Sequence, residues 1–269
     1  MRGPSAFAAL LLLAAAGVQA AGYAVPVLVD GKTPDLRGIW QARGTAYLNL
    51  EGHKGGKGLA ASRSIIVDPA DGRIPYKPEA LQKRDENFRA REQRDPATLC
   101  YQPGVPRAVL LPSPFQVVQS PGNIAFVYTE AHSFRIVYPE SRPHYTGVDW
   151  WMGDSRGRWE GSTLVVDVTT QNNDTWLDSA GNHHTDNIHV VERYTRVARD
   201  RMIYEATIED PDTYTRPWTI RTTLYRDLRP GARIAEDECL EDEFGVRRRV
   251  LPTDPHSLLI NDYRRWKKP

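Results

Sequence analysis

The sequence has little net charge, few cysteines and no long apolar run beyond its first twenty residues. Its 35 basic and 34 acidic residues leave a formal net charge of +1. That balance argues against a nucleic-acid-binding protein, because such domains need a basic excess to displace counterions. The hydrophobic share of 40% and the charged share of 26% are ordinary for a globular chain, which argues against global disorder.

The first twenty residues are the exception to this shortage of apolar runs. They combine a basic Arg2, an apolar run over residues 6–16 and small residues at Val18 and Ala20. This order is typical of a secretory signal peptide, and the run is too short to cross roughly 30 Å of hydrocarbon comfortably. We therefore expect residues 1–20 to be removed. The mature chain, residues 21–269, would be periplasmic or secreted, with no membrane contact after cleavage.

The two cysteines, Cys100 and Cys239, take their interpretation from the predicted export. In an oxidising compartment a lone pair of cysteines most simply forms one disulfide bond. A catalytic thiol is the alternative, but it would leave the second cysteine without a role. A Cys100–Cys239 bond would join distant parts of the chain, so it favours a single domain over two independent ones.

Short strands between turn residues dominate the rest of the pattern, and twenty prolines and twenty glycines supply the turns. This favours an antiparallel barrel or sandwich, and we expect an all-β protein with one lipocalin-like antiparallel barrel of about ten strands. The charged segment from Pro78 to Arg94 predicts one surface helix, since proline suits a first helical position. The expected strands are 36–42, 64–67, 115–120, 123–129, 133–138, 163–169, 187–197, 202–209, 219–226 and 233–239.

Five separated blocks within roughly residues 99–241 carry a resemblance. They are PGVPR at 103–107, GRWEG at 157–161, TLVVD at 163–167, TD followed by HVVER at 185–193, and DP followed by YTRPW at 210–218. In this order they resemble a large uncharacterised family of exported bacterial proteins. The resemblance implies export and a shared site but no reaction. The chain departs from the family's usual loop, which has Gly-Phe-Asn where Thr170, Gln171 and Asn172 stand here.

A candidate acid–base site lies in the histidine-rich segment that opens the strand expected at 187–197. His189 and Arg193 are spaced to share one face of that strand. A histidine beside a carboxylate is the usual means of poising an imidazole near neutral pH, and an arginine can hold a carboxylate or an enolate oxygen. We predict His189 as general acid or base, Asp186 as its orienting partner and Arg193 as the clamp. The alternative is that His189 and Arg193 only bind cross-strand carboxylates such as Glu205.

The pocket around this site is expected to hold a small organic molecule. Asp154 and His184 would supply polar contacts, and Trp159 and Trp176 would wall the pocket, since ring-bearing ligands often lie on such surfaces. Packing in the core is the more frequent role of buried tryptophans, and it remains the alternative for both.

Metal binding is a second interpretation of the same segment. His183, His184, Asp186 and His189 include the ligand types that zinc, iron and copper prefer. Their spacing matches no strong metal motif, and no dinucleotide fingerprint is present, so we expect neither a metal nor a cofactor.

Three hypotheses for the function follow. The leading one is an exported, cofactor-independent acid–base enzyme, a lyase, isomerase or cyclase, that acts on a small organic molecule in a barrel pocket. The second is a periplasmic binding protein with the same pocket and no catalysis. The third is a metal-dependent hydrolase that uses the histidine cluster.

Overall fold

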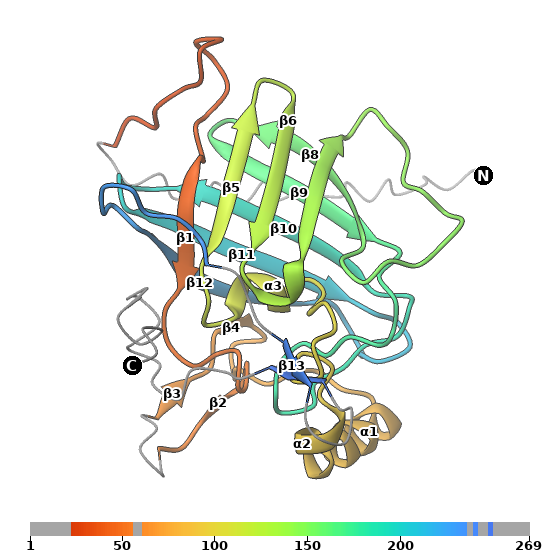
Figure 1. Ribbon diagram of the computed structural model, residues 1–269. Coiled ribbons are helices and arrows are strands. Elements are labelled where there is room, and N and C mark those ends of the chain that lie inside the picture. Colours follow the sequence, from red (N-terminus) through yellow and green to blue (C-terminus); the bar gives the residue numbers. More distant parts are fainter. Residues whose placement is uncertain (1–22, 56–60, 236–238, 242–246, 250–269) are drawn as a thin grey trace, which may run out of the picture.

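Alternation of buried and exposed side chains organises the longest strands. In β10 (His189–Arg196) every second side chain is buried, as expected for a strand with one face toward a core and the other toward solvent. The computed structural model describes residues 23–55, 61–235, 239–241 and 247–249 (Figure 1). The predicted signal peptide, residues 1–20, lies outside the described residues.

A closed barrel is built from strands in the order β1-β5-β6-β7-β8-β9-β10-β11-β12, because β12 also pairs with β1. The further strand β4 adds to the edge of β12. Every pair in this barrel is antiparallel except β7 and β8, which run parallel. The predicted all-β barrel is therefore confirmed, but the expectation of a purely antiparallel barrel is wrong. The connection 140–153 between these two strands is long enough to return the chain for a parallel pairing.

The barrel strands not yet delimited are β1 (Gly38–Ala42), β5 (Phe115–Ser120), β6 (Asn123–Tyr128), β7 (Phe134–Pro139), β8 (Asp154–Glu160), β9 (Thr163–Thr169), β11 (Arg201–Glu209) and β12 (Trp218–Arg226). Outside the barrel are β2 (Gly52–His53), β3 (Ser62–Arg63), β4 (Ile66–Asp68), β13 (Cys239–Glu241), β14 (Arg247–Arg249) and the 3-10 turn η1 (Glu130–His132).

Strand β8 is the one barrel strand that the sequence pattern did not predict. Its outward positions are all charged, namely Asp154, Arg156, Arg158 and Glu160. One of its inward positions is Gly157, where an added Cβ would lie 2.4 Å from Val137 Cγ1 of the neighbouring strand. The apolar alternation that marks the other strands is therefore missing here. The strand expected at 233–239 is not formed over 233–235, and β13 begins only at Cys239.

Two short helices, α1 (Pro78–Arg89) and α2 (Arg91–Arg94), replace the single helix expected over 78–94. The interruption lies at Ala90, which leaves the helical conformation. Ala80 and Asn87 are the buried residues of α1, and the Asn87 amide donates a hydrogen bond to the Gly181 carbonyl. No helix in the described part of the chain is long and apolar enough to cross a membrane.

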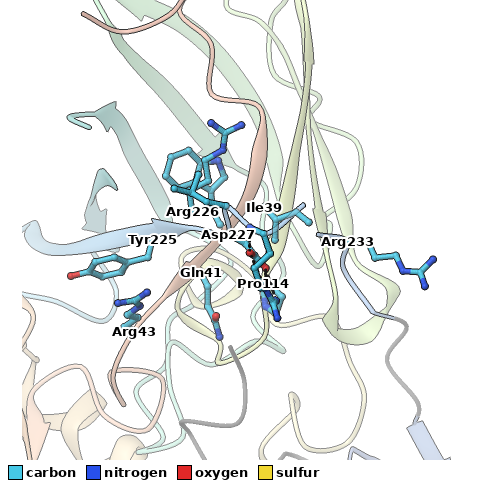
Figure 2. Close-up of a pocket in the computed structure, with 11 residues that line it drawn as sticks. Ile39, Gln41, Arg43, Pro114, Tyr225, Arg226, Asp227 and Arg233 are labelled. Carbon is cyan, nitrogen blue, oxygen red and sulfur yellow. Dashed lines mark hydrogen bonds and ion pairs between the residues drawn. The ribbon is translucent and has the colours of Figure 1, made fainter. Parts of the chain in front are cut away.

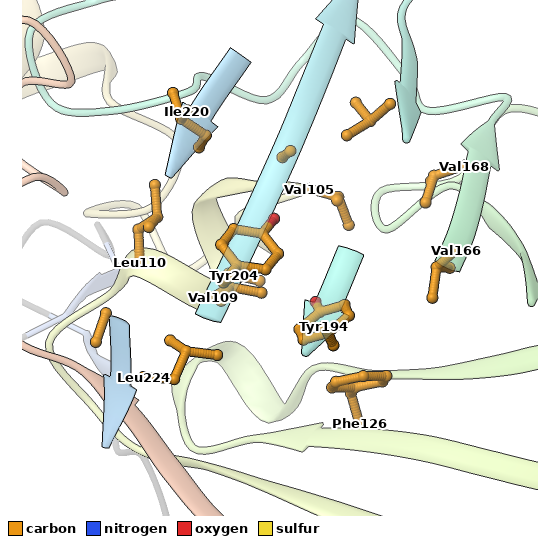
Figure 3. Close-up of a cluster of buried hydrophobic side chains, with 14 of the residues drawn as sticks. Val105, Val109, Leu110, Phe126, Val166, Val168, Tyr194, Tyr204, Ile220 and Leu224 are labelled. Carbon is orange, nitrogen blue, oxygen red and sulfur yellow. The ribbon is translucent and has the colours of Figure 1, made fainter. Parts of the chain in front are cut away.

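A third helix, α3 (Arg107–Leu110), lies at one end of the barrel, and all four of its residues are buried. Figure 3 shows Val109 and Leu110 of this helix among Tyr204, Ile220 and Leu224 of the barrel wall. The helix therefore fills this end of the barrel with side chains. Figure 1 shows α1 and α2 beyond that same end.

A buried ion pair lies in the barrel interior. The Arg135 guanidinium contacts the Glu192 carboxylate at 2.5 Å, and both side chains are almost fully buried. Tyr194 and Tyr204 each donate a hydrogen bond to the same carboxylate at 2.8 Å. Burial of a charged pair is tolerated only when such additional bonds satisfy it, so this pair forms part of the packed core.

Candidate functional site

Two of the predicted acid–base residues, His189 and Arg193, lie on the outer face of the barrel, and Asp186 lies in the loop before β10. His189 opens β10 with its side chain 37% exposed, while Val190 and Glu192 point inward and are buried. The His189 Nε2–H donates a hydrogen bond of 3.0 Å to Oδ2 of Asp167 on β9. Asp186 is exposed in the preceding loop and makes no hydrogen bond with a described residue. The carboxylate that orients His189 is therefore Asp167.

His189 belongs to a chain of alternating charges that we call the outer-wall network: Arg156, Asp154, His144, Asp167 and His189. His144 bridges two carboxylates, with Nδ1 2.9 Å from Asp154 Oδ2 and Nε2 2.8 Å from Asp167 Oδ1. Asp154 also accepts a bond of 2.7 Å from Arg156. His144 lies in the connection 140–153, so the network ties that connection to the barrel wall.

The hydrogen bond between His189 and Asp167 favours the charged form of both groups. The hydrogen bond to Asp167 raises the pKa of His189, and the bond from His189 lowers the pKa of the Asp167 carboxyl. His144 contacts both carboxylates, with Nδ1 on Asp154 and Nε2 on Asp167. The reactive nitrogens are thus already bonded within the protein, except for His189 Nδ1, which lies 3.9 Å from Glu209 Oε2.

Arg193 shares the outer face with His189, as the alternation predicted, but it binds elsewhere. Its guanidinium donates a bond of 2.8 Å to Glu160, which also binds Arg158. Glu205, the carboxylate considered as an alternative partner, accepts instead from Arg221. Arg193 therefore forms a surface ion pair next to the outer-wall network.

A cavity of about 680 Å³, which we call the end cavity, lies between the α1–α2 segment and the loops at the plugged end of the barrel. Two of the predicted pocket residues, Trp176 and His184, line it, and both are nearly buried. The complete lining is Lys83, Asn87, Arg94, Pro96, Leu99, Tyr101, Trp151, Asn173, Asp174, Trp176, His183, His184 and Thr185.

Aromatic rings wall the end cavity from three separate segments. Tyr101 stacks on Trp151 with ring centres 4.9 Å apart and planes 6° from parallel. Trp176 lies in the loop after β9 and forms a β-bridge with His183. The other predicted wall residue, Trp159, packs against the hydrophobic core and does not line the end cavity.

The two adjacent histidines of the end cavity are held neutral. Burial lowers the pKa of His183 to about 4, and burial also lowers the pKa of His184. His184 is fixed by three hydrogen-bond contacts, with the Thr185 carbonyl at 2.7 Å on Nδ1 and with Thr175 and Gln171 at 2.7 and 3.1 Å on Nε2. His183 stacks on Tyr76, and its Nδ1 is buried without a hydrogen-bond partner.

Gln171 connects the floor of the end cavity to the segment that precedes α3, the helix that fills this end of the barrel. Its side chain accepts from the Val105 N–H at 2.7 Å and donates to the Val105 carbonyl at 3.1 Å, directly before α3. It also contacts Thr175 and His184. Gln171 is therefore a structural link between the segment before α3 and the wall of the end cavity.

The histidines considered as metal ligands point to different places. His184 is bonded within the floor of the end cavity, whereas His189 is bonded to Asp167 on the outer wall. In the part of the chain that the structure describes, no group of at least three His, Cys, Asp or Glu side chains is arranged to hold a metal ion. The metal-dependent hydrolase has no geometric support among these residues.

A smaller cavity of about 250 Å³ lies between β1 and the segment that follows β12, and arginines are frequent in its wall (Figure 2). Arg43 stacks over the Tyr225 ring at 4.0 Å, and Arg229 binds Asp227. Figure 2 shows Arg43 and Arg226 in different parts of the wall. These arginines therefore do not converge on one position.

No known family model matches the chain, and neither a curated protein nor a solved structure matches it significantly.

Proposed function

We propose that the protein binds a small, ring-bearing organic molecule in the end cavity. The observation that carries the proposal is that aromatic rings from three segments, Tyr101, Trp151 and Trp176, line a cavity of about 680 Å³. This volume lies within the range of ~300–1,000 Å³ that is typical of small-molecule sites. The polar groups here are the neutral imidazoles of His183 and His184 and the side chains at the cavity rim.

The proposal includes export of the protein, and this part of it is supported by the sequence alone. The N-terminal pattern and the resemblance to an exported family both support a periplasmic or secreted protein. A Cys100–Cys239 disulfide would suit that compartment. The side chain of Cys239 lies outside the described residues, so the bond remains a prediction.

A second candidate function is acid–base catalysis by His189, and one observation favours it. The hydrogen bond from His189 to Asp167 is the arrangement by which a carboxylate raises the basicity of an imidazole. In this proposal Asp167 takes the role that the sequence assigned to Asp186. His189 lines neither of the two cavities described above, so a substrate would have to reach it on the outer wall.

Two adjacent tryptophans provide the test of ligand binding. Trp151 lines the end cavity, whereas Trp150 is 48% exposed and does not line it. We expect mature protein to bind 2-naphthoate or 2-naphthamide by calorimetry, and Trp151→Ala to weaken binding about three- to tenfold, since one aromatic stacking contact contributes ~0.5–1.5 kcal/mol. Trp150→Ala should leave the affinity unchanged. Failure of both compounds to bind, or equal effects of the two variants, would contradict the proposal.

The catalytic candidate is tested once a bound compound is found to react. His189→Gln should then abolish turnover while leaving the affinity within about tenfold, because a catalytic group acts on the transition state. Unchanged turnover in this variant would exclude His189 as the acid–base group.

A further inference from the structure

The lining of the end cavity carries more positive than negative charge. Lys83 on α1 and Arg94 on α2 line it, and neither side chain makes a hydrogen bond or an ion pair with a described residue. Both side chains are exposed at the rim, whereas Trp176 and His184 are buried at the floor. Asp174, in the loop after β9, is the one acidic residue of the lining. The cavity thus has an aromatic floor and a cationic rim.

The histidines do not change this charge balance near neutral pH. Burial keeps the pKa of His183 at about 4 and lowers the pKa of His184 from its ordinary value, so both imidazoles are neutral. Two cations against one carboxylate therefore leave the lining with one net positive charge. A ligand with one negative charge would neutralise it.

We propose that the ligand of the end cavity is a planar organic anion, a ring that carries one carboxylate. Its ring would lie against Trp176 and the Tyr101–Trp151 stack, and its carboxylate would bind Lys83 and Arg94 at the rim. This inference rests on the proposed function and specifies the class of ligand. The planar guanidinium of Arg94 matches a carboxylate in two parallel hydrogen bonds, and the Lys83 ammonium adds a point charge.

His183 offers the ligand one further hydrogen-bonding group. Its Nδ1 is buried without a hydrogen-bond partner. Nε2 has no hydrogen-bond partner among the described residues, so it is free to form a hydrogen bond with a polar group of the ligand.

Three compounds with the same ring and an anionic, a neutral or a cationic substituent test the inference by calorimetry on the mature protein: 2-naphthoate, 2-naphthamide and 2-naphthylmethylamine. We expect the carboxylate to bind about tenfold more tightly than the amide at low salt, and the advantage to shrink as salt is added. The amine should bind most weakly. Lys83→Gln and Arg94→Gln should each reduce the preference for the carboxylate several-fold, and the double variant should remove it. Arg89→Gln, an exposed α1 arginine outside the lining, is the matched control and should leave the preference unchanged.

The possible outcomes separate the inference from the proposed function. Equal binding of the amide and the carboxylate would overturn the anion inference and leave ligand binding intact. Preference for the amine would overturn it as well. If the double variant still preferred the carboxylate over the amide, Lys83 and Arg94 would not be the residues that bind the carboxylate. Failure of all three compounds to bind would contradict the proposed function itself.

Discussion

The end cavity and the outer-wall network both contain histidines, yet they hold them in opposite states. His183 and His189 are only six positions apart in the sequence. Burial lowers the pKa of His183, whereas a hydrogen bond to Asp167 raises the pKa of His189. The first is a neutral hydrogen-bonding group beside a cavity, whereas a carboxylate on the barrel surface favours the charged form of the second.

Residues that are close in sequence therefore need not belong to one site. The chain leaves the end loops at Ile188 and enters β10 at His189, where alternate side chains turn to opposite faces of the wall. The histidine-rich segment is therefore divided between two environments at that point. Each prediction below tests one consequence of this division.

The largest expected effect is a difference in the free energy of unfolding between two variants, each with a histidine of one environment replaced by alanine. His184→Ala removes the buried partner of Thr175, Gln171 and the Thr185 carbonyl, so we expect a loss of about 2–4 kcal/mol in the free energy of unfolding. His189→Ala removes one half-exposed ion pair and should cost under ~1 kcal/mol. Urea denaturation of both variants measures the two values. Equal losses would contradict the assigned environments.

The barrel itself was largely predictable from the sequence. The alternation in segments such as 115–120 and 163–169 predicted β5 and β9 with their observed bounds, because one face of each strand packs on the core. β8 was not predictable in this way. Its outward side is charged, and it is held by the long connection and by pairing with β7 and β9.

The partners within the site depend on register, which the sequence does not fix. Asp167 lies opposite Val191, so its side chain is diagonal to His189 on the same outer face and within reach of it. A shift of two residues would have given His189 another partner. His144 lies in the connection 140–153, where no periodicity positions a side chain. Trp176 and His184 were predicted at a pocket because they lie in the loops near β10, and they do line the end cavity.

An intermediate effect is expected from His183 in acid. Its pKa is about 4 in the folded chain and 6.5 in the unfolded chain, so the unfolded chain binds more protons between these values. The contribution of the neutral imidazole to the free energy of unfolding is therefore fully present above pH 6.5, and it is lost as the pH falls toward 4. Between pH 6.5 and 4, the free energy of unfolding of His183→Gln should fall by about 1–3 kcal/mol less than that of the wild type.

Denaturation at several acidic pH values measures this difference. Burial raises the pKa of Asp178 to about 6, so this carboxyl stays protonated to a higher pH in the folded chain than in the unfolded chain. Its contribution to stability therefore increases as the pH falls, opposite to that of His183. Asp178 is common to both proteins, so its contribution cancels in the comparison. Identical pH dependence of the wild type and His183→Gln would show that this imidazole is not buried as a neutral group.

The smallest effect belongs to His189 and lies on the alkaline side. Because its folded pKa is raised above 6.5, its contribution to stability is fully present below pH 6.5 and is lost as the pH rises through the folded pKa. The loss should stay under ~1 kcal/mol, since the side chain is half-exposed and solvent screens the pair. Thermal denaturation from about pH 6 to 9 measures it, the range in which a histidine with a raised pKa titrates.

His189→Gln keeps a hydrogen-bond donor for Asp167 but carries no titrating group, so it separates charge from hydrogen bonding at this position. We expect its stability to change less than that of the wild type as the pH rises. His132→Gln, at an exposed histidine that makes no hydrogen bond with a described residue, should retain the wild-type dependence. If His189→Gln retained it too, the alkaline loss of stability would not come from the bond between His189 and Asp167.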